Sequence, residues 1–230
     1  MAAFEYLYMI RVHYLKNSRS HRILWLLETL ALEYEIITYP RDSKTQLAPE
    51  SLKRVHPLGK SPVVTDGDIT VAESGAIIDY LLRRYGEGRC QPDTDDTVDW
   101  VNYRYWLHYA EGSLMPLLVM RLVFAQLPKQ SPWLVKPIVK AINAKVNANF
   151  ITPQLTDHLN MIENHLATRQ QFSSSWPSGA DVQMSFPLQS LSMAQSLDAY
   201  PAIAAFVARI DADPAWQRVV ARAGPLTLSG

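Results

Sequence analysis

Apolar and polar positions alternate at the start of the chain and then change their period. Every second residue over positions 8–14 is apolar or aromatic, which is typical of a β-strand with one buried face. After a polar turn, apolar residues beginning with Ile23 and Leu24 recur at helical spacing, and they predict a helix over residues 19–32. Residues 34–39 predict a second strand. A strand, helix and strand in this order should form a right-handed crossover with parallel strands.

A second group of short elements follows this unit. Residues 40–61 are a polar connection in which we expect a short helix. Residues 63–65 and 69–72 predict two strands, because the Asp-Gly-Asp sequence between them is typical of a hairpin turn. Residues 74–85 again show helical spacing. The predicted order is therefore βαβ, a connection with one helix, and then ββα, which together form one α/β domain over residues 1–88.

The remainder of the chain predicts helices alone. Gly86, Gly88 and Pro92 indicate a linker between two domains. Beyond it we expect an all-α domain over residues 89–230, in which the first long helix bends at Pro116. The helices that the pattern predicts cover residues 94–126, 134–168, 180–192, 201–212 and 214–222.

Charge and cysteine content narrow the possible functions. The chain has 22 basic and 22 acidic residues, and this zero net charge argues against nucleic acid and against an anionic membrane as partners. The single cysteine, Cys90, excludes an internal disulfide and favours a reducing compartment. Since the start of the chain lacks a signal-peptide pattern, we expect a cytoplasmic protein. The six histidines include no pair four residues apart, so no helical metal site is predicted.

The turn between the first strand and the first helix can hold an anion. A helix N-terminus directs N–H groups and the positive end of its dipole at whatever lies in front of it. Asn17 and Ser18 lie in this turn and can donate hydrogen bonds to a thiolate, whereas Ser20 is expected to cap the helix.

Two further motifs suit a peptide ligand that contains an amino-acid head group. Lys60 and Ser61 precede Pro62 at the start of a strand, and a cis bond there would turn the Ser61 backbone toward an extended peptide. Glu73 and Ser74 open the helix after the hairpin, where the carboxylate suits an ammonium group and the helix N-terminus suits a carboxylate.

These motifs, taken in their order and spacing, resemble the cytosolic glutathione S-transferase family over nearly the whole chain. The resemblance includes Ser178 and Asp181, which have the spacing of a capping box, so we interpret Asp181 as a folding residue. Glu111-Gly112-Ser113 and the segment 184–189 look most like the fungal-type branch, which also occurs in bacteria. The motifs that carry the resemblance in the first domain are residues 18–27, 56–62 and 73–77.

The resemblance implies a thioredoxin-like N-terminal domain, glutathione as the co-substrate, no metal and a homodimer. It implies that a small hydrophobic electrophile binds between the two domains. Ser61, with Pro62 in cis, is expected to bind the cysteinyl unit of glutathione, and Glu73 with Ser74 its γ-glutamyl group. Lys60 is expected to reach a glutathione carboxylate, and His56 lies in the same loop.

The residue that activates the thiol is less sharply defined. Some classes of the family use a tyrosine in the first strand, and others use a serine or a cysteine in the turn after it. The turn here has no cysteine. Counting back from Arg22, the position that holds the active serine or cysteine in several classes of the family falls on Asn17 or Ser18. We prefer Ser18, with Asn17 and then Tyr14 as alternatives.

The electrophile pocket should use the aromatic helix after the linker. Tyr105 and Tyr109 share one face of that helix, as do Trp106 and Ser113, and we expect Tyr105, Tyr109 and Ser113 to contact the electrophile. Two alternatives remain beside conjugation of an electrophile to glutathione. One is a glutathione-dependent peroxidase at the same site, and the other is a non-catalytic protein of this fold that binds a regulatory partner.

Overall fold

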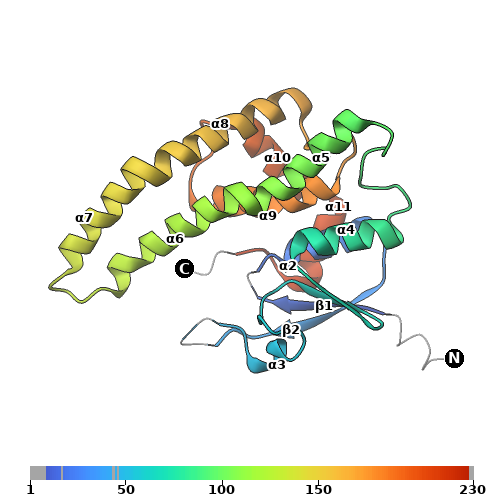
Figure 1. The fold of residues 1–230 in the computed structure, drawn as a ribbon, viewed down its shortest axis with the longest axis horizontal. Coiled ribbons are helices and arrows are strands. Elements are labelled where there is room, and N and C mark those ends of the chain that lie inside the picture. Colours follow the sequence, from blue (N-terminus) through green and yellow to red (C-terminus); the bar gives the residue numbers. More distant parts are fainter. Residues whose placement is uncertain (1–8, 17, 43–44, 46, 228–230) are drawn as a thin grey trace.

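The computed structural model describes residues 9–16, 18–42, 45 and 47–227. Its N-terminal part is a four-stranded sheet in the order β2-β1-β3-β4 (Figure 1). β1 and β2 are parallel, whereas β3 pairs antiparallel with both β1 and β4. The strands are β1 (Ile10–Leu15), β2 (Tyr34–Tyr39), β3 (Val63–Asp66) and β4 (Ile69–Ala72).

Three helices complete this domain, namely α2 (Ser20–Thr29), α3 (Glu50–Lys53) and α4 (Ser74–Tyr85). The predicted thioredoxin-like order, βαβ followed by one helix and ββα, is confirmed. α2 packs between the sheet and the second domain, where it contacts α9 (Gly179–Ala194) and α11 (Pro214–Ala223). Eight of its ten residues are buried. The apolar spacing in the sequence predicts one buried face, so α2 is buried on more of its surface than expected.

The prediction that β1 has one buried face is wrong. His13 lies on the supposedly open face, but it is buried and its two ring nitrogens contact the hydroxyls of Tyr39 (2.9 Å) and Thr65 (3.2 Å). A second, smaller apolar cluster of Leu15, Tyr39 and Leu52 covers the sheet there. Burial lowers the pKa of His13.

Residues 86–96 connect the sheet domain to a domain whose described elements are all helices, and the first of these helices begins three residues later than predicted (Figure 1). Two π-helical segments, η2 and η3, were not predicted. Pro116 lies inside a continuous helical run, two residues after η2, so the wider π turn accommodates the N–H that the proline lacks and the helix geometry changes beside the proline. The remaining elements are α5 (Thr97–Tyr109), η2 (Ala110–Leu114), α6 (Met115–Gln130), α7 (Lys136–Val146), η3 (Asn147–Ile151), α8 (Thr152–Arg169) and α10 (Pro201–Asp211).

The capping box at the start of α9 is confirmed. Ser178 Oγ accepts from the Asp181 N–H, and the Asp181 carboxylate accepts from the Ser178 N–H and hydroxyl and from the Phe172 N–H. Asp181 is fully buried, and burial raises its pKa to about 6 although these hydrogen bonds act in the opposite direction. Asp181 therefore ties the loop 172–178 to the helix.

The continuous helical run Thr97–Gln130 is long and apolar enough to cross a membrane by length and composition alone. α5, its first half, packs against α9. Arg104 also pairs with Asp79 of α4 at 2.9 Å. We therefore assign this half as a core helix between the two domains.

Candidate active site

Three segments that are far apart in the sequence meet at one end of the sheet. β1 ends at Leu15, whose N–H donates to Ser61 Oγ at 3.1 Å. Val63, the first residue of β3, pairs with Ala72, the last residue of β4. This register places the loop before β3 beside Glu73 and beside the turn after β1. The three motifs that the sequence singled out therefore lie together.

Three serine hydroxyls form a chain at this end of the sheet. Ser61 Oγ donates to the His13 carbonyl at 2.9 Å. Each hydroxyl has one hydrogen, so Ser20 must donate in its 2.6 Å contact with Ser61 Oγ. Ser18 Oγ in turn donates to Ser20 Oγ at 2.9 Å. The chain of donors therefore begins at Ser18 and ends at the backbone of β1.

The structure changes the role expected for Ser20. The N-cap position of α2 is held by Arg19, whose side chain makes no capping hydrogen bond, and Ser20 is the first residue inside the helix. It is Ser18 Oγ that accepts from the Ser20 N–H, at 3.2 Å. Ser20 is wholly buried, so it is a link between Ser18 and Ser61 and not a simple cap.

Glu73 and Ser74 stand at the start of α4. Glu73 has a φ of 71°, in the left-handed region that residues with a side chain seldom adopt. Its side chain is exposed, whereas Ser74 is buried as the first residue of the helix. Such backbone strain costs about 1–3 kcal/mol and is concentrated at ligand sites, which supports a binding role for this turn.

The loop before β3 presents the other predicted binding residues. The Ser61–Pro62 peptide bond is cis. Lys60 is exposed, and His56 is half-buried with its Nδ1 atom lacking a hydrogen-bond partner among the described residues. Gly59 has a φ of 56°, and a Cβ atom there would come within 2.8 Å of Lys53 Cγ. Glycine is therefore required to bring Lys60 and Ser61 to the end of the sheet.

Tyr14 and Asn17 are the two other candidates for activating the thiol, and the structure describes only Tyr14. Tyr14 is buried in the main core, and its ring packs edge-on against His21 at 5.4 Å between centroids. Asn17 lies outside the described residues.

Of the three residues expected to bind the electrophile, Tyr105 and Tyr109 contact α8. The Tyr105 hydroxyl lies 3.6 Å from Met161 Sδ, and the Tyr109 hydroxyl contacts His158 Nδ1. The described contacts do not bring these two tyrosines to the serine chain. Ser113 lies in η2, two residues after Glu111, and is half-buried.

Glu111 links the two domains beside the serine chain, a role that sequence reasoning missed. Its Oε1 atom accepts from Arg19 Nε at 3.0 Å and from Arg22 Nη2 at 2.6 Å. The Arg22 side chain is fully buried and also donates to the Gln183 carbonyl at 2.9 Å. Burial lowers the pKa of Arg22 to about 10, but the guanidinium stays charged at neutral pH. Arg22 directly before the apolar run 23–27 of α2 was the signal in the sequence, since a charge buried beside such a run needs a partner.

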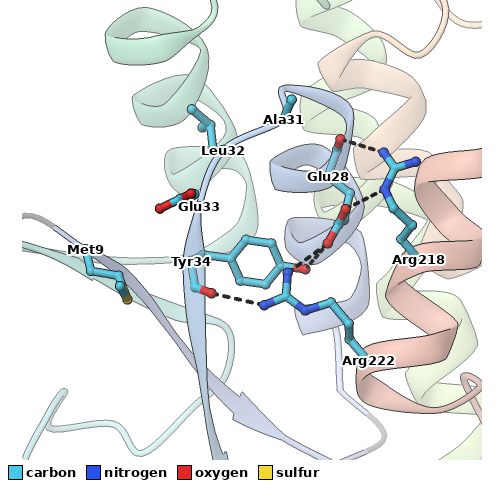
Figure 2. A pocket seen from close by; sticks show the side chains of 8 residues that line it. All are labelled: Met9, Glu28, Ala31, Leu32, Glu33, Tyr34, Arg218 and Arg222. Carbon is cyan, nitrogen blue, oxygen red and sulfur yellow. Dashed lines mark hydrogen bonds and ion pairs between the residues drawn. The ribbon is translucent and has the colours of Figure 1, made fainter.

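A separate hollow of about 510 Å³ lies at the opposite end of α2 (Figure 2). Three of its four charged groups already pair with one another, because Glu28 accepts from Arg218 and Arg222, and also from Tyr34, at 2.7 to 2.9 Å. No cluster of three or more metal-ligating side chains occurs in the part of the chain that the structure describes. The serine chain and the Glu73 turn are therefore the candidate site.

Comparison with known proteins agrees with this geometry. The family model of the glutathione S-transferase N-terminal domain matches residues 8–83. Glutathione S-transferase 3 of Schizosaccharomyces pombe is 37% identical over 181 residues, which cover 78% of this chain and 73% of the relative. Glutathione S-transferase 1 of Saccharomyces cerevisiae is 34% identical over 79% of this chain and 80% of the relative.

A solved glutathione S-transferase from Actinobacillus pleuropneumoniae superimposes with a TM-score of 0.77 at 34% identity. The match covers 95% of this chain and 94% of that one. The fungal and bacterial sources of these relatives agree with the branch that the sequence motifs indicated, and the prediction of a transferase is confirmed. This chain belongs to the glutathione S-transferase family.

Proposed function

We propose that the chain binds glutathione across the end of the sheet and promotes attack of its thiolate on a hydrophobic electrophile, so that a new bond joins the glutathione sulfur to the electrophile. The observation that carries the proposal is the serine chain at the N-terminus of α2, which shares one end of the sheet with the Glu73 turn. In this proposal Ser18 donates to the sulfur, Ser61 and Pro62 bind the cysteinyl backbone, and Glu73 with Ser74 binds the γ-glutamyl group. Lys60 and His56 face the remaining carboxylate.

The serine chain suggests how Ser18 stabilises a thiolate. Its hydrogen is directed at Ser20 Oγ, so it must rotate toward an arriving sulfur. The rotation gives up one neutral hydrogen bond, which is worth about 0.5–1.5 kcal/mol, and forms one to a charged group, which is worth about 1.5–3 kcal/mol. The exchange is favourable only when the sulfur is ionised, so it lowers the thiol pKa.

The positions of Glu73 and Ser74 suit an α-amino-acid group. The exposed Glu73 carboxylate can pair with the ammonium group, while Ser74 and the first N–H groups of α4 can bind the carboxylate. Both charges of the ligand are then satisfied within one turn of backbone.

Structures with the same fold support this ligand and this reaction. A sphingomonad glutathione S-transferase, 19% identical with a TM-score of 0.68, was solved in complex with glutathione. The Ure2p5 protein of Phanerochaete chrysosporium, 15% identical with a TM-score of 0.68, was cocrystallised with 1-(S-glutathionyl)-2,4-dinitrobenzene. That compound forms when the glutathione thiolate displaces a leaving group, such as a halide ion, from the aromatic carbon.

We extend the proposal to the electrophile site and the assembly. Tyr109 and Ser113 each lie two residues from Glu111, which makes the interdomain contact, and Tyr105 stacks on Tyr109 one turn earlier. In this proposal the three residues line the electrophile pocket. A homodimer in a reducing compartment such as the cytoplasm suits the family and a thiol co-substrate. The exposed apolar Val98 and Val101 of α5 are of the kind that an interface between copies would cover.

The test combines calorimetry with two activity assays. Wild-type protein should bind glutathione, and a 1-halo-2,4-dinitrobenzene should give the conjugate named above, while an organic hydroperoxide measures the peroxidase alternative. Ser18→Ala should bind glutathione but lose about 10- to 100-fold in kcat/KM, which corresponds to one or two units of thiol pKa. Ser192→Ala, which removes a helical serine hydroxyl in α9, is the matched control. Absence of binding at millimolar glutathione would overturn the proposal.

A further inference from the structure

α6, the loop 131–135 and α7 form a helical hairpin, here called the arm, that extends beyond the rest of the molecule (Figure 1). No residue of α7 is buried, and only Met115, Leu117 and Pro128 are buried in α6. The arm therefore contributes little to the core that holds the two domains together.

The surface of the arm is strongly apolar. At its tip, Trp133 is 80% exposed and Leu134 is 69% exposed. Ile138 and Ile142 lie one turn apart on α7, and both are exposed. On α6, Val119, Leu122, Val123 and Leu127 recur at helical spacing and are likewise exposed. Exposed apolar residues gathered on one element mark an interaction surface.

The charge of the arm has a single sign. Residues 115–146 contain five basic residues and no Asp or Glu, which leaves 17 basic and 22 acidic residues elsewhere in the chain. The zero net charge, which argued against an anionic membrane, therefore conceals a basic arm on an acidic body. Within the described residues, none of the arm's lysines forms an ion pair. These lysines are Lys129, Lys136, Lys140 and Lys145.

We propose that the arm docks on an anionic phospholipid surface, with Trp133 and Leu134 inserted at the level of the headgroups and the lysines above them. A helix that combines lysines with exposed Ile, Leu and Trp has the composition of segments that lie in the membrane interface. Tryptophan in particular is enriched at the boundary between water and lipid. Each basic residue near an anionic surface adds about fivefold to binding, which is the equivalent of about 1 kcal/mol.

Charge favours lipid over a second copy of the arm. Pairing two arms would bring their lysines together, and residues 115–146 supply no carboxylate to neutralise them. An anionic bilayer supplies negative charge and an apolar interior at once. The exposed side chains of Trp133, Leu134 and Ile138 favour lipid over nucleic acid, which would bind the charges and leave the apolar tip in water.

The test is cosedimentation of the full chain with vesicles of phosphatidylcholine, alone or mixed with phosphatidylserine. Wild-type protein should bind the mixed vesicles, and high salt should weaken the binding. Lys136→Glu/Lys140→Glu should lower the partition coefficient at least about 25-fold, on the fivefold contribution of each cation. Trp133→Ser/Leu134→Ser should lower it as well, with circular dichroism showing that each variant is folded.

Two matched controls carry the same changes outside the arm. Arg54→Glu/Arg83→Glu alters the net charge equally, and Leu47→Ser/Leu58→Ser removes exposed leucines of the first domain. Both should bind vesicles as the wild type does. Equal binding to both kinds of vesicle, or unchanged binding by the arm variants, would contradict the proposal. It would also be overturned if the arm variants changed the oligomeric state measured by light scattering and the wild type bound no vesicles.

Discussion

Ser18, Ser20 and Ser61 act as a unit, because each hydroxyl has only one hydrogen to donate. The chain ends on the His13 carbonyl, so the two inner hydroxyls are fixed and the outermost, Ser18, is the one free to turn. Sequence patterns identified Ser18 and Ser61 but assigned Ser20 to helix capping. The connection among them depends on the pairing of β1 with β3, which no local pattern contains.

Glu73 gives the sharpest prediction for glutathione binding at the residue scale. Glu73→Gln removes the charge that would pair with the ligand's ammonium group but leaves the turn and its donors in place. We expect the KM for glutathione to rise about 2- to 5-fold with little change in kcat, as for an exposed ion pair made equally in ground and transition states. Steady-state kinetics measures this, with Glu87→Gln, another exposed glutamate at positive φ, as the control. A fall in kcat at unchanged KM would place Glu73 in the chemical step instead.

Among the helices and strands, the sequence predicted those features that depend only on residues close together in the chain. The capping box of α9, the hairpin between β3 and β4, and the extents of β2 and α4 follow from spacing alone. The π segments η2 and η3 were missed although η2 contains Gly112 and each segment ends two residues before a proline, because such residues mark a break in a helix but not a change in its hydrogen-bond register. In η2 this register places Glu111 against α2.

The capping box of α9 should stabilise the protein more than an exposed N-cap does, because Asp181 is buried and also binds the loop before the helix. Asp181→Ala removes a buried carboxylate and leaves the Phe172 and Ser178 N–H groups without an acceptor. We expect the free energy of unfolding to fall by about 2–4 kcal/mol. Asp96→Ala removes the exposed N-cap of α5 and should cost about 1 kcal/mol. Urea denaturation compares the two, and equal losses would show that burial of Asp181 adds nothing.

The burial of His13 in β1 predicts a pH dependence of stability. Burial lowers the pKa of His13 below 6.5, so the folded protein binds fewer protons than the unfolded chain in the range below that value. The contribution of neutral His13 to the free energy of unfolding should be complete above about pH 6.5 and should be lost as the pH falls through the pKa of His13 in the folded protein. His13→Gln should weaken this dependence between about pH 7.5 and 5, whereas His108→Gln, an exposed change, should not. A His13→Gln variant with the same pH slope as the wild type would exclude His13 as its source.

At the scale of the whole molecule, Glu111 connects the domains through two arginines on α2. Glu111→Gln would leave the buried Arg22 guanidinium without its counter-charge. Because Glu111 is itself about one-third exposed, water replaces part of the loss, and we expect a decrease of about 1–3 kcal/mol in the free energy of unfolding. Glu50→Gln breaks the exposed pair with Lys53 and should cost less than about 0.5 kcal/mol. Equal decreases in the free energy of unfolding for the two variants would show that the interdomain ion pair stabilises the protein no more than an exposed pair does.

The division into a sheet domain and a helical domain was predictable because strand patterns occur only before the linker, whereas helical spacing alone follows it. The contacts between the halves were not, since Glu111 is 89 residues from Arg22 in the chain and nothing in either neighbourhood marks the other. The family resemblance supplied the site residues, and the fold explains why they converge on one end of the sheet.

Activation of the glutathione sulfur is measured most directly as the thiol pKa of glutathione bound to the protein, followed through the ultraviolet absorbance of the thiolate. A free thiol has a pKa of about 8.5, and the site should lower the pKa of the bound glutathione thiol by about 1–2 units. In the Ser18→Ala variant the bound thiol should titrate close to the free value, whereas in Ser192→Ala its pKa should stay as low as in the wild type. A bound thiol that titrates as the free one does, or a shift that survives the loss of the Ser18 hydroxyl, would contradict activation of the sulfur by Ser18.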